Sequence, residues 1–339
     1  MNSLAKNGFS TSAITRAWHA VLVTTAPVAL LDAASLYFRS FFALPDSMTA
    51  PDGTPVNAVR GFTDTVARII VDRRPSRLVA CLDADWRPQF RVDALPSYKA
   101  HRVAEATPQG ADVEEVPDTL TPQVPIILDL LEAVGLATGE ATGFEADDVI
   151  GTLTATEETD PVEVITGDRD LFQLVRTEPT PASVIYVGKG WAKAEVLGPA
   201  EIGARYGVPA EQAGPAYADM SMLRGDPSDG LPGVAGIGEK TAAKLITQFG
   251  SLGALVEAAR RESPDLPVKT RTRLNEAADY LAVAPTVVRV APDAPVVLSR
   301  DDRIPAEPAD PDRVAELAQR WNLGNSVKRL LDALESREA

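Results

Sequence analysis

The sequence is poor in residues that form disulfides or bind soft metals, and it has no long apolar run. Its 339 residues include one cysteine, Cys81, and two histidines, His19 and His101. A single cysteine excludes an internal disulfide, and these three side chains are too few for the usual zinc site. No apolar run reaches the ~18 residues of a membrane-spanning helix, and the N-terminal stretch lacks the pattern of a signal peptide. We therefore expect a cytoplasmic protein with no membrane partner.

Positive charge is also in short supply, with 33 Lys and Arg against 48 Asp and Glu and a formal net charge of −15. Proteins that bind nucleic acid usually show the opposite balance. Acids gathered around metal ions, however, distort a count taken over the whole chain. Nine such acids are identified below, and the rest of the chain carries a formal charge of −6. The acidic total therefore does not exclude DNA as a partner.

Three short apolar segments predict buried strands, and each is followed by aspartate. They are residues 28–31 before Asp32, 77–82 before Asp83, and 161–166 before Asp168 and Asp170. Continuous apolar strands with helical segments between them indicate an α/β domain with a mostly parallel sheet. Ligands of such sheets bind at the carboxyl ends of the strands. We therefore expect these acids to share a site.

The length allows more than one domain, and composition divides the chain into four parts. They are a mobile extension at 1–25, an α/β core at 26–198, an all-α unit at 199–283, and a segment at 284–339 that returns to the core. Residues 104–123 are rich in Pro, Gly, Thr and acid, which is typical of a loop or mobile insertion. In the last part, Val287–Val290 predicts a late strand.

Nine carboxylates stand in apolar or glycine-bounded surroundings. They are Asp32, Asp83, Glu145, Asp147, Asp148, Asp168, Asp170, Asp226 and Asp229. Nine such groups share one site only if cations offset their repulsion. Oxygen ligands without histidine or cysteine favour Mg²⁺ or Mn²⁺, and two such ions can promote phosphodiester hydrolysis. Any one of these acids could instead cap a helix or lie in a solvated turn, and Asp83-Ala-Asp85 alone could also begin an aspartyl-phosphate phosphatase motif.

Closely spaced glycines between two helical segments form a candidate phosphate-binding turn. The turn contains Gly233, Gly236, Gly238 and Lys240. Its glycines allow backbone N–H groups to approach a phosphate at the start of a helix. No buried strand precedes it, so a dinucleotide-binding reading is poor. A helix-hairpin-helix that binds the DNA backbone fits better, and an ordinary turn between packed helices is the alternative.

A basic stretch follows the second strand. It contains Arg87, Arg91, Tyr98, Lys99 and Arg102. Cations with an aromatic ring could contact phosphates and stack a base, although a solvated basic helix would look the same. Because this stretch directly follows Asp83, we favour a functional role. Arg39, seven residues after Asp32, could point into the same cleft.

Five segments together resemble the bacterial 5′ nucleases, and in particular the 5′→3′ exonuclease domain of DNA polymerase I, a relative of the flap endonucleases. The segments, in order, are VALLDAASLYFRSFFALP, LDADWRPQFRVDALPSYKAHR, GFEADDVIG, VITGDRDLFQLV and GDPSDGLPGVAGIGEKTA. The resemblance implies a PIN-like nuclease core, a helical arch at about 86–123, and a helix-three-turn-helix that carries the hairpin.

The resemblance also implies roles for individual residues. It places Asp32, Asp83, Glu145, Asp147 and Asp148 at a first metal ion, and Asp168, Asp170, Asp226 and Asp229 at a second. It places Arg39, Tyr98, Lys99 and Arg102 near the scissile phosphate, and Arg91 one residue later than the usual arginine. The hairpin of the family also holds a K⁺ ion. Where relatives usually carry Asn after the last aspartate, this chain has Gly230, so we expect a looser turn around Asp229.

We therefore expect a stand-alone bacterial 5′ nuclease that uses two Mg²⁺ or Mn²⁺ ions. It would act as a monomer on DNA with 5′ flaps, nicks, gaps or 5′ overhangs, as a flap endonuclease and 5′→3′ exonuclease in replication and repair. Two alternatives remain open at this point. One is a structure-specific DNA-binding relative with weak or no catalysis, and the other is a PIN-type ribonuclease.

Overall fold

The computed structural model describes residues 26–105 and 113–337, so the extension expected at 1–25 lies outside the described residues. A seven-stranded sheet has the order β8-β7-β6-β1-β2-β5-β9, with only the edge strands β8 and β9 antiparallel to their neighbours. The strands are β1 Val28–Asp32, β2 Arg77–Cys81, β5 Ala137–Glu140, β6 Val162–Thr166, β7 Ala182–Tyr186, β8 Glu195–Leu197 and β9 Val297–Leu298. The expected α/β fold with a mostly parallel sheet is confirmed.

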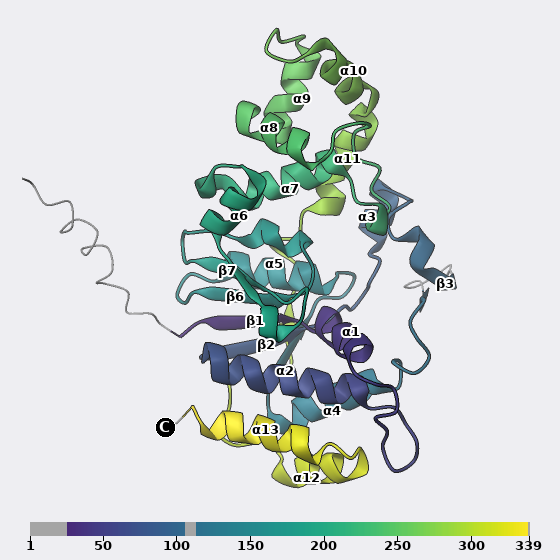
Figure 1. Ribbon diagram of the computed structural model, residues 1–339, viewed down its shortest axis with the longest axis vertical. Helices are drawn as coiled ribbons and strands as arrows, with labels where there is room; N and C mark the ends of the chain where they lie inside the picture. Colours follow the sequence, from purple (N-terminus) through teal and green to yellow (C-terminus); the bar gives the residue numbers. More distant parts are fainter. Residues whose placement is uncertain (1–25, 106–112, 338–339) are drawn as a thin grey trace, which may run out of the picture.

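The two faces of the sheet contact different cores, as the alternation of side chains along a strand requires. Ala29 and Leu31 of β1 pack on one side, against one group of helices. That group is α1 Ala33–Ala43, α2 Asn57–Arg73, α4 Gln123–Val134, α12 Pro311–Arg320 and α13 Gly324–Glu335. Val28 and Leu30 pack on the other side, where α5 Ala146–Thr156 covers the sheet (Figure 1). Burial on both faces explains why β1 has no polar residue before Asp32.

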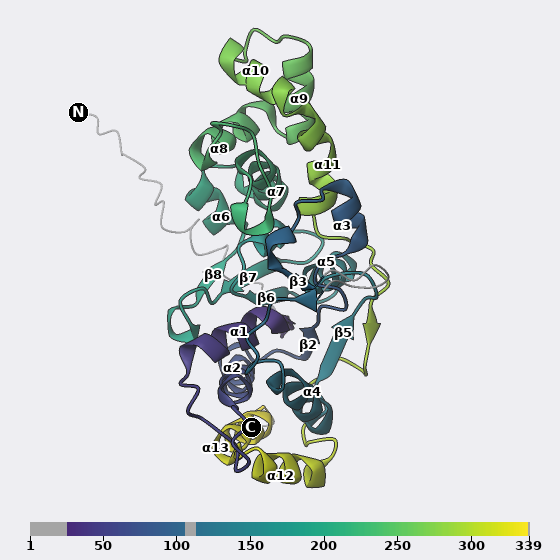
Figure 2. The ribbon, with the colours of Figure 1, turned by 90° about the vertical axis from the view of Figure 1, so that its right-hand side faces the viewer.

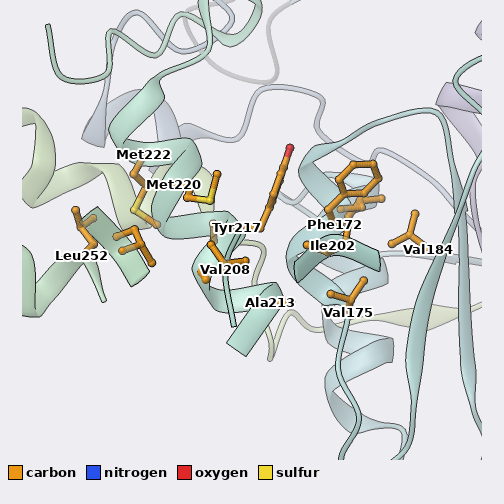
Figure 3. Close-up of a cluster of buried hydrophobic side chains, with 14 of the residues drawn as sticks. Phe172, Val175, Val184, Ile202, Val208, Ala213, Tyr217, Met220, Met222 and Leu252 are labelled. Carbon is orange, nitrogen blue, oxygen red and sulfur yellow. The ribbon is translucent and has the colours of Figure 1, made fainter. Parts of the chain in front are cut away.

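A helical domain continues from this second face. Its helices are α6 Pro199–Tyr206, α7 Ala213–Arg224, α8 Glu239–Phe249, α9 Leu252–Arg260, α10 Val268–Glu276 and α11 Ala278–Val288. Phe172, which follows β6, packs between Val184 of β7 and Tyr217 of α7 (Figure 3). The core of the sheet is therefore continuous with the core of the helices. This shared core holds the helical domain beside the edge where the parallel strands have their carboxyl ends.

The late strand expected at Val287–Val290 is wrong. Val287 and Val288 end α11, and the chain returns to the sheet only at β9, which pairs antiparallel with β5. Leu281, Ala284 and Val287 are all buried at helical spacing. The packing of this face therefore outweighs the strand preference of the valines.

The insertion between β2 and α4 is mostly irregular. Its described part contains the short helix α3 Gln89–Ala94, a 3₁₀ turn at Ala100–Arg102 and the strands β3 Val103–Glu105 and β4 Val113–Glu114. Pro88 and Pro96 flank α3 and limit its length, since proline cannot continue a helix. Where the resemblance implies a helical arch, the described residues thus form this short helix and the 3₁₀ turn, and 106–112 lie outside them. Figure 2 shows α3 beside α11 of the helical domain.

Gly151 of α5 marks where the returning chain crosses this helix. A Cβ atom at this position would lie 2.5 Å from Cγ2 of Val290 and 2.9 Å from the carbonyl oxygen of Ala291. Although alanine is the better helix former, we expect Gly151→Ala to lower the free energy of unfolding by about 1–3 kcal/mol. Urea unfolding followed by circular dichroism measures the change.

The matched control is Gly324→Ala at the start of α13, where a Cβ atom would meet nothing within 4 Å. This variant should raise the free energy of unfolding by about 0.4–1 kcal/mol through the entropy of the unfolded chain. Equal effects of the two substitutions would contradict the assigned contact.

Candidate active site

The acids at the strand ends are held in place by hydrogen bonds. Asp32 caps α1 by accepting from the Ser35 N–H at 3.0 Å, and its other oxygen accepts from the Thr166 hydroxyl at 2.6 Å. Asp83 accepts from the Ala146 N–H at 2.8 Å, and Asp168 accepts from the Asp170 N–H at 2.8 Å. Because β1 pairs in parallel with both β2 and β6, these acids lie at one edge of the sheet.

A cleft of about 460 Å³ lies at this edge. The acids that line it are Asp32, Asp83, Glu114, Glu145, Asp147, Asp168, Asp170, Asp226 and Asp229, and the cations are Arg39, Lys99, Arg102 and Arg169. The structure thus brings together eight of the nine predicted acids. Sequence reasoning missed Glu114, whose Pro- and Gly-rich surroundings gave no signal. It also missed Arg169, although this residue lies between two quoted aspartates.

Asp148 and Arg91 do not belong to the open cleft. Asp148 is fully buried, and its two oxygens accept from Arg91 at 2.7 and 2.9 Å. It also accepts from the Ala291 N–H at 2.8 Å and from the Glu145 N–H at 3.2 Å. With its lone pairs satisfied in this way, Asp148 acts as a buried brace. In this structure Asp148 and Arg91 are thus paired with each other away from the cleft, and their roles as metal ligand and DNA contact stay predictions.

Tyr98 also differs from its prediction. Its ring is buried, and its hydroxyl donates to Glu145 at 2.8 Å, so the ring is not available to stack on a base in this conformation. Glu145 receives further donors from Arg91 and from Nζ of Lys99. Lys99 remains half-buried at the wall of the cleft. Glu145 therefore connects the buried Asp148–Arg91 pair to the cleft.

The other two predicted cations are held by contacts across the cleft. Arg102 donates to Asp229 at 2.7 Å and to the Ser228 carbonyl at 2.9 Å. Arg39 donates to the carbonyls of Gly167 and Gly188, both at 2.9 Å. Arg39 thus holds the loops that follow β6 and β7 and lines the cleft at the same time.

The glycine-rich turn joins α7 to α8. Gly233 packs against the end of α7, where a Cβ atom would lie 2.5 Å from the Arg224 carbonyl oxygen. Gly236, Gly238 and Lys240 are exposed. Arg273 of α10, which sequence reasoning missed, donates to the Gly236 carbonyl at 3.1 Å. The turn therefore presents its backbone and a cation to solvent.

Burial and mutual repulsion raise the pKa values of several carboxyl groups in the cleft. Burial is the main cause that raises the pKa of Asp32 to about 7, and the charges of Asp83 and Asp168 add to it. Burial likewise raises the pKa of Asp170 to about 8, with contributions from Asp168, Asp229 and Asp226. Burial, with the charges of Asp32 and Asp168, also raises the pKa of Asp147. Such carboxylates are stabilised by added positive charge.

These donors fit hard divalent cations, because they offer only oxygen and carry an excess of negative charge. All eight predicted acids that line the cleft are candidate ligands, and the charge of Asp168 acts on Asp32, Asp147 and Asp170. Within residues 26–105 and 113–337, no three such side chains are already arranged as a metal-coordination group.

An acidic cleft at the carboxyl edge of a parallel sheet, beside a helical domain with an exposed glycine turn, places the molecule in the class of 5′ nucleases. Residues 27–207 match the family described as 5′-3′ exonuclease, N-terminal resolvase-like domain, and residues 213–312 match its C-terminal SAM fold. The chain belongs to the 5′-3′ exonuclease family and is a 5′-3′ exonuclease. The phosphatase, the PIN-type ribonuclease and the non-catalytic binder are set aside.

Relatives with known sequences support this assignment. A 5′-3′ exonuclease of Mycobacterium tuberculosis is 58% identical over 312 residues, which cover 91% of this chain and 98% of that protein. A 5′-3′ exonuclease of Streptomyces coelicolor is 54% identical over 305 residues, covering 90% and 99%. DNA polymerase I of M. tuberculosis is 40% identical over 231 residues, which are 67% of this chain but 24% of the polymerase.

Solved structures share the fold at lower identity. The bacteriophage T5 D15 flap endonuclease, in a complex with DNA and metal ions, has a TM-score of 0.60 at 19% identity and covers 92% of this chain. The catalytic core of Rad2 with a DNA substrate has a TM-score of 0.54 at 15% identity and covers 93%. Across the described residues, no helix is both long and apolar enough to span a membrane.

The raised pKa of Asp170 gives a test of the electrostatics. Because the folded state holds this proton more tightly than the unfolded chain does, stability without metal falls as the pH rises from about 4 to about 8. We expect Asp170→Asn in chelator to be more stable than the parent by on the order of 2 kcal/mol at pH 8, and equal to it near pH 4.

Mg²⁺ or Mn²⁺ should then raise the melting temperature of the parent more than that of Asp170→Asn, because the variant relieves less repulsion on binding. Glu307→Gln, at an exposed position of the chain, serves as the charge-matched control. An Asp170→Asn protein that is no more stable than this control at pH 8 would refute the raised pKa of Asp170.

Proposed function

We propose that this exonuclease hydrolyses DNA phosphodiesters with two divalent ions, and that it also cleaves 5′ flaps near the junction with duplex. The observation that carries the proposal is the set of eight predicted acids in one cleft, faced by Lys99 and Arg102. Asp32, Asp83, Glu145 and Asp147 would hold the first ion. Asp168, Asp170, Asp226 and Asp229 would hold the second.

When bound, two such ions supply an activated water and offset charge on the leaving oxygen. The protein's own cations have a separate role. Lys99 is paired with Glu145 and Arg102 with Asp229. Once those carboxylates have other positive partners, Lys99 and Arg102 can turn to the phosphate and stabilise the charge that develops on it. Arg39 holds two of the loops around them and lines the same cleft.

The helical domain would hold the duplex. Gly236, Gly238 and Lys240 present backbone and charge to a phosphate strand without base recognition, and a K⁺ ion at the turn would add to this. Lys244 of α8 and Lys269 of α10 are also exposed near this end of the domain. Substrate choice would then follow from duplex shape and a threaded 5′ strand. We infer that a monomer suffices, because all of these groups come from one chain.

The decisive experiment uses a 5′-labelled flap duplex with Mg²⁺, with Mn²⁺ and with chelator. We expect short labelled products cut near the junction in either metal and none in chelator. Asp168→Ala should lose cleavage by more than ~10³-fold while flap binding stays within about tenfold, because Asp168 lines the cleft and its charge acts on Asp32, Asp147 and Asp170. Retained cleavage by this variant would refute the metal assignment, and mononucleotide products alone would limit the enzyme to exonuclease action.

The Lys99→Ala variant distinguishes a role of Lys99 in the chemical step from a role in DNA binding. We expect the single-turnover rate at saturating enzyme to fall by about 10²–10³-fold, with the dissociation constant for the flap changed by less than tenfold. Lys244→Ala, on the exposed side of α8, should instead weaken binding and leave the single-turnover rate unchanged. The reverse pattern would make Lys99 a docking residue.

A further inference from the structure

Four hydrogen bonds join the insertion to the turn that carries the last two acids. The insertion contributes residues 97–102 and the acidic turn residues 226–230. The Lys99 N–H donates to the Asp229 carbonyl at 3.1 Å, and the Ser97 hydroxyl donates to the Gly230 carbonyl at 2.8 Å. Arg102 donates to Asp229 and to the Ser228 carbonyl. The two segments therefore form one unit across the cleft.

Gly230 lies at the closest approach of these two segments. A Cβ atom on Gly230 would lie 2.0 Å from the carbonyl oxygen of Ser97 and 2.8 Å from its carbonyl carbon. Both are backbone atoms, so no rotation of a side chain could relieve the overlap. Any side chain at this position would push residues 97–102 away from the acidic turn.

Glycine is required at position 230 because there is no space for a Cβ atom, and not because of the backbone angle. Gly230 has φ of +73°, a conformation that asparagine adopts more readily than other side chains do. The Asn usual in relatives would therefore satisfy the backbone angle but would collide with Ser97. The turn itself is closed by mutual hydrogen bonds between Asp226 and Leu231, at 2.8 and 3.0 Å. The absence of a side chain at Gly230 permits the close contact with Ser97.

This contact sets the direction of both cations. Lys99 has φ of +47°, which is uncommon for a residue with a side chain and persists only where the surroundings hold it. Its N–H bond to the Asp229 carbonyl supplies that restraint, and the bond from the Ser97 hydroxyl to the Gly230 carbonyl adds to it. Arg87 further restrains the segment by donating to the carbonyls of Pro96 and Tyr98.

We propose that Gly230 is a positioning residue, whose lack of a side chain lets residues 97–102 seat on the acidic turn and so places Lys99 and Arg102 at the scissile phosphate. This inference rests on the proposed roles of those two cations. It predicts that the chemical step, rather than folding or DNA affinity, is sensitive to a side chain at position 230. Gly230 acts only through its neighbours and contacts no substrate itself.

The test compares Gly230→Asn with Gly207→Asn. Gly207 also has φ of +73°, but a Cβ atom there would meet nothing within 4 Å. We expect Gly230→Asn to lower the single-turnover rate by about 10–100-fold and to change KM less than threefold, because a displacement of about 1 Å has such effects. Amide exchange at Lys99 should become about tenfold faster as its bond to Asp229 is lost. Gly207→Asn should change none of these quantities.

Ser97→Ala, which removes only the bond to the Gly230 carbonyl, provides a second variant that does not challenge folding. It should shift exchange and rate in the same direction by a smaller factor. In a Lys99→Ala, Arg102→Ala background, adding Gly230→Asn should change the rate by less than twofold, because the groups through which it acts are gone. Additive effects, or exchange at Lys99 that is unchanged in both Gly230→Asn and Ser97→Ala, would overturn the proposal.

The proposed roles of Lys99 and Arg102 and the positioning role of Gly230 are tested by different outcomes. If Lys99→Ala and Arg102→Ala leave cleavage unchanged, the proposed roles of these cations are wrong, and exchange at Lys99 still reports whether Gly230 seats the segment. If those variants slow cleavage while Gly230→Asn speeds exchange without slowing cleavage, the positioning role is wrong and the function stands.

Discussion

The repulsion among carboxylates at one edge of the sheet is the constraint on which the rest of the site depends. Parallel strands β1, β2 and β6 all deliver their acids to the same edge, so the chain cannot spread these charges apart. Burial raises the pKa of Asp32 and of Asp170, and the charges of the neighbouring acids add to this effect. The fold tolerates this repulsion because hydrogen bonds fix Asp32, Asp83 and Asp168, and because the insertion supplies Lys99 and Arg102 to the same cleft. The insertion is therefore an electrostatic partner of the sheet as well as a cover for its edge.

The acids divide into two groups with different physical roles. Asp148 is satisfied by Arg91 and by two backbone N–H groups, so it binds α3, α5 and the returning chain together. Breaking such a pair would leave an uncompensated buried charge, which is strongly destabilising. Asp147, one residue earlier on the same helix, is only half-buried and faces the cleft. A difference of one position on a helix thus separates a structural acid from a candidate ligand.

Features of the site that follow from local sequence patterns could be predicted, whereas those that depend on contacts between residues far apart in the sequence could not. The strands that end in Asp32, Asp83 and Asp168 were predictable, because a short apolar run followed by an acid is a local pattern. The burial of Arg91 and Tyr98 was not, since it follows from contacts with Glu145 about fifty residues away along the chain. The valines at 287 and 288 were misassigned because strand preference is local, whereas the burial of Val287 on α11 depends on tertiary packing. The closeness of Gly230 to Ser97 joins segments that no spacing rule connects.

An acidic cleft also constrains how a nuclease can bind its substrate. The phosphate backbone of DNA is repelled by the cleft unless bound cations reverse its field, so affinity has to come from elsewhere on the surface. Lys240 and Lys244 of α8 and Lys269 of α10 are exposed on the helical domain. The proposed function therefore separates two tasks, with the helical domain holding duplex and the cleft admitting a single phosphate. Because the core of the sheet continues into α7 through Phe172 and Tyr217, the distance between the two places is fixed by packing (Figure 3). A rigid spacing of this kind would select the cleavage position by geometry, without recognition of any base.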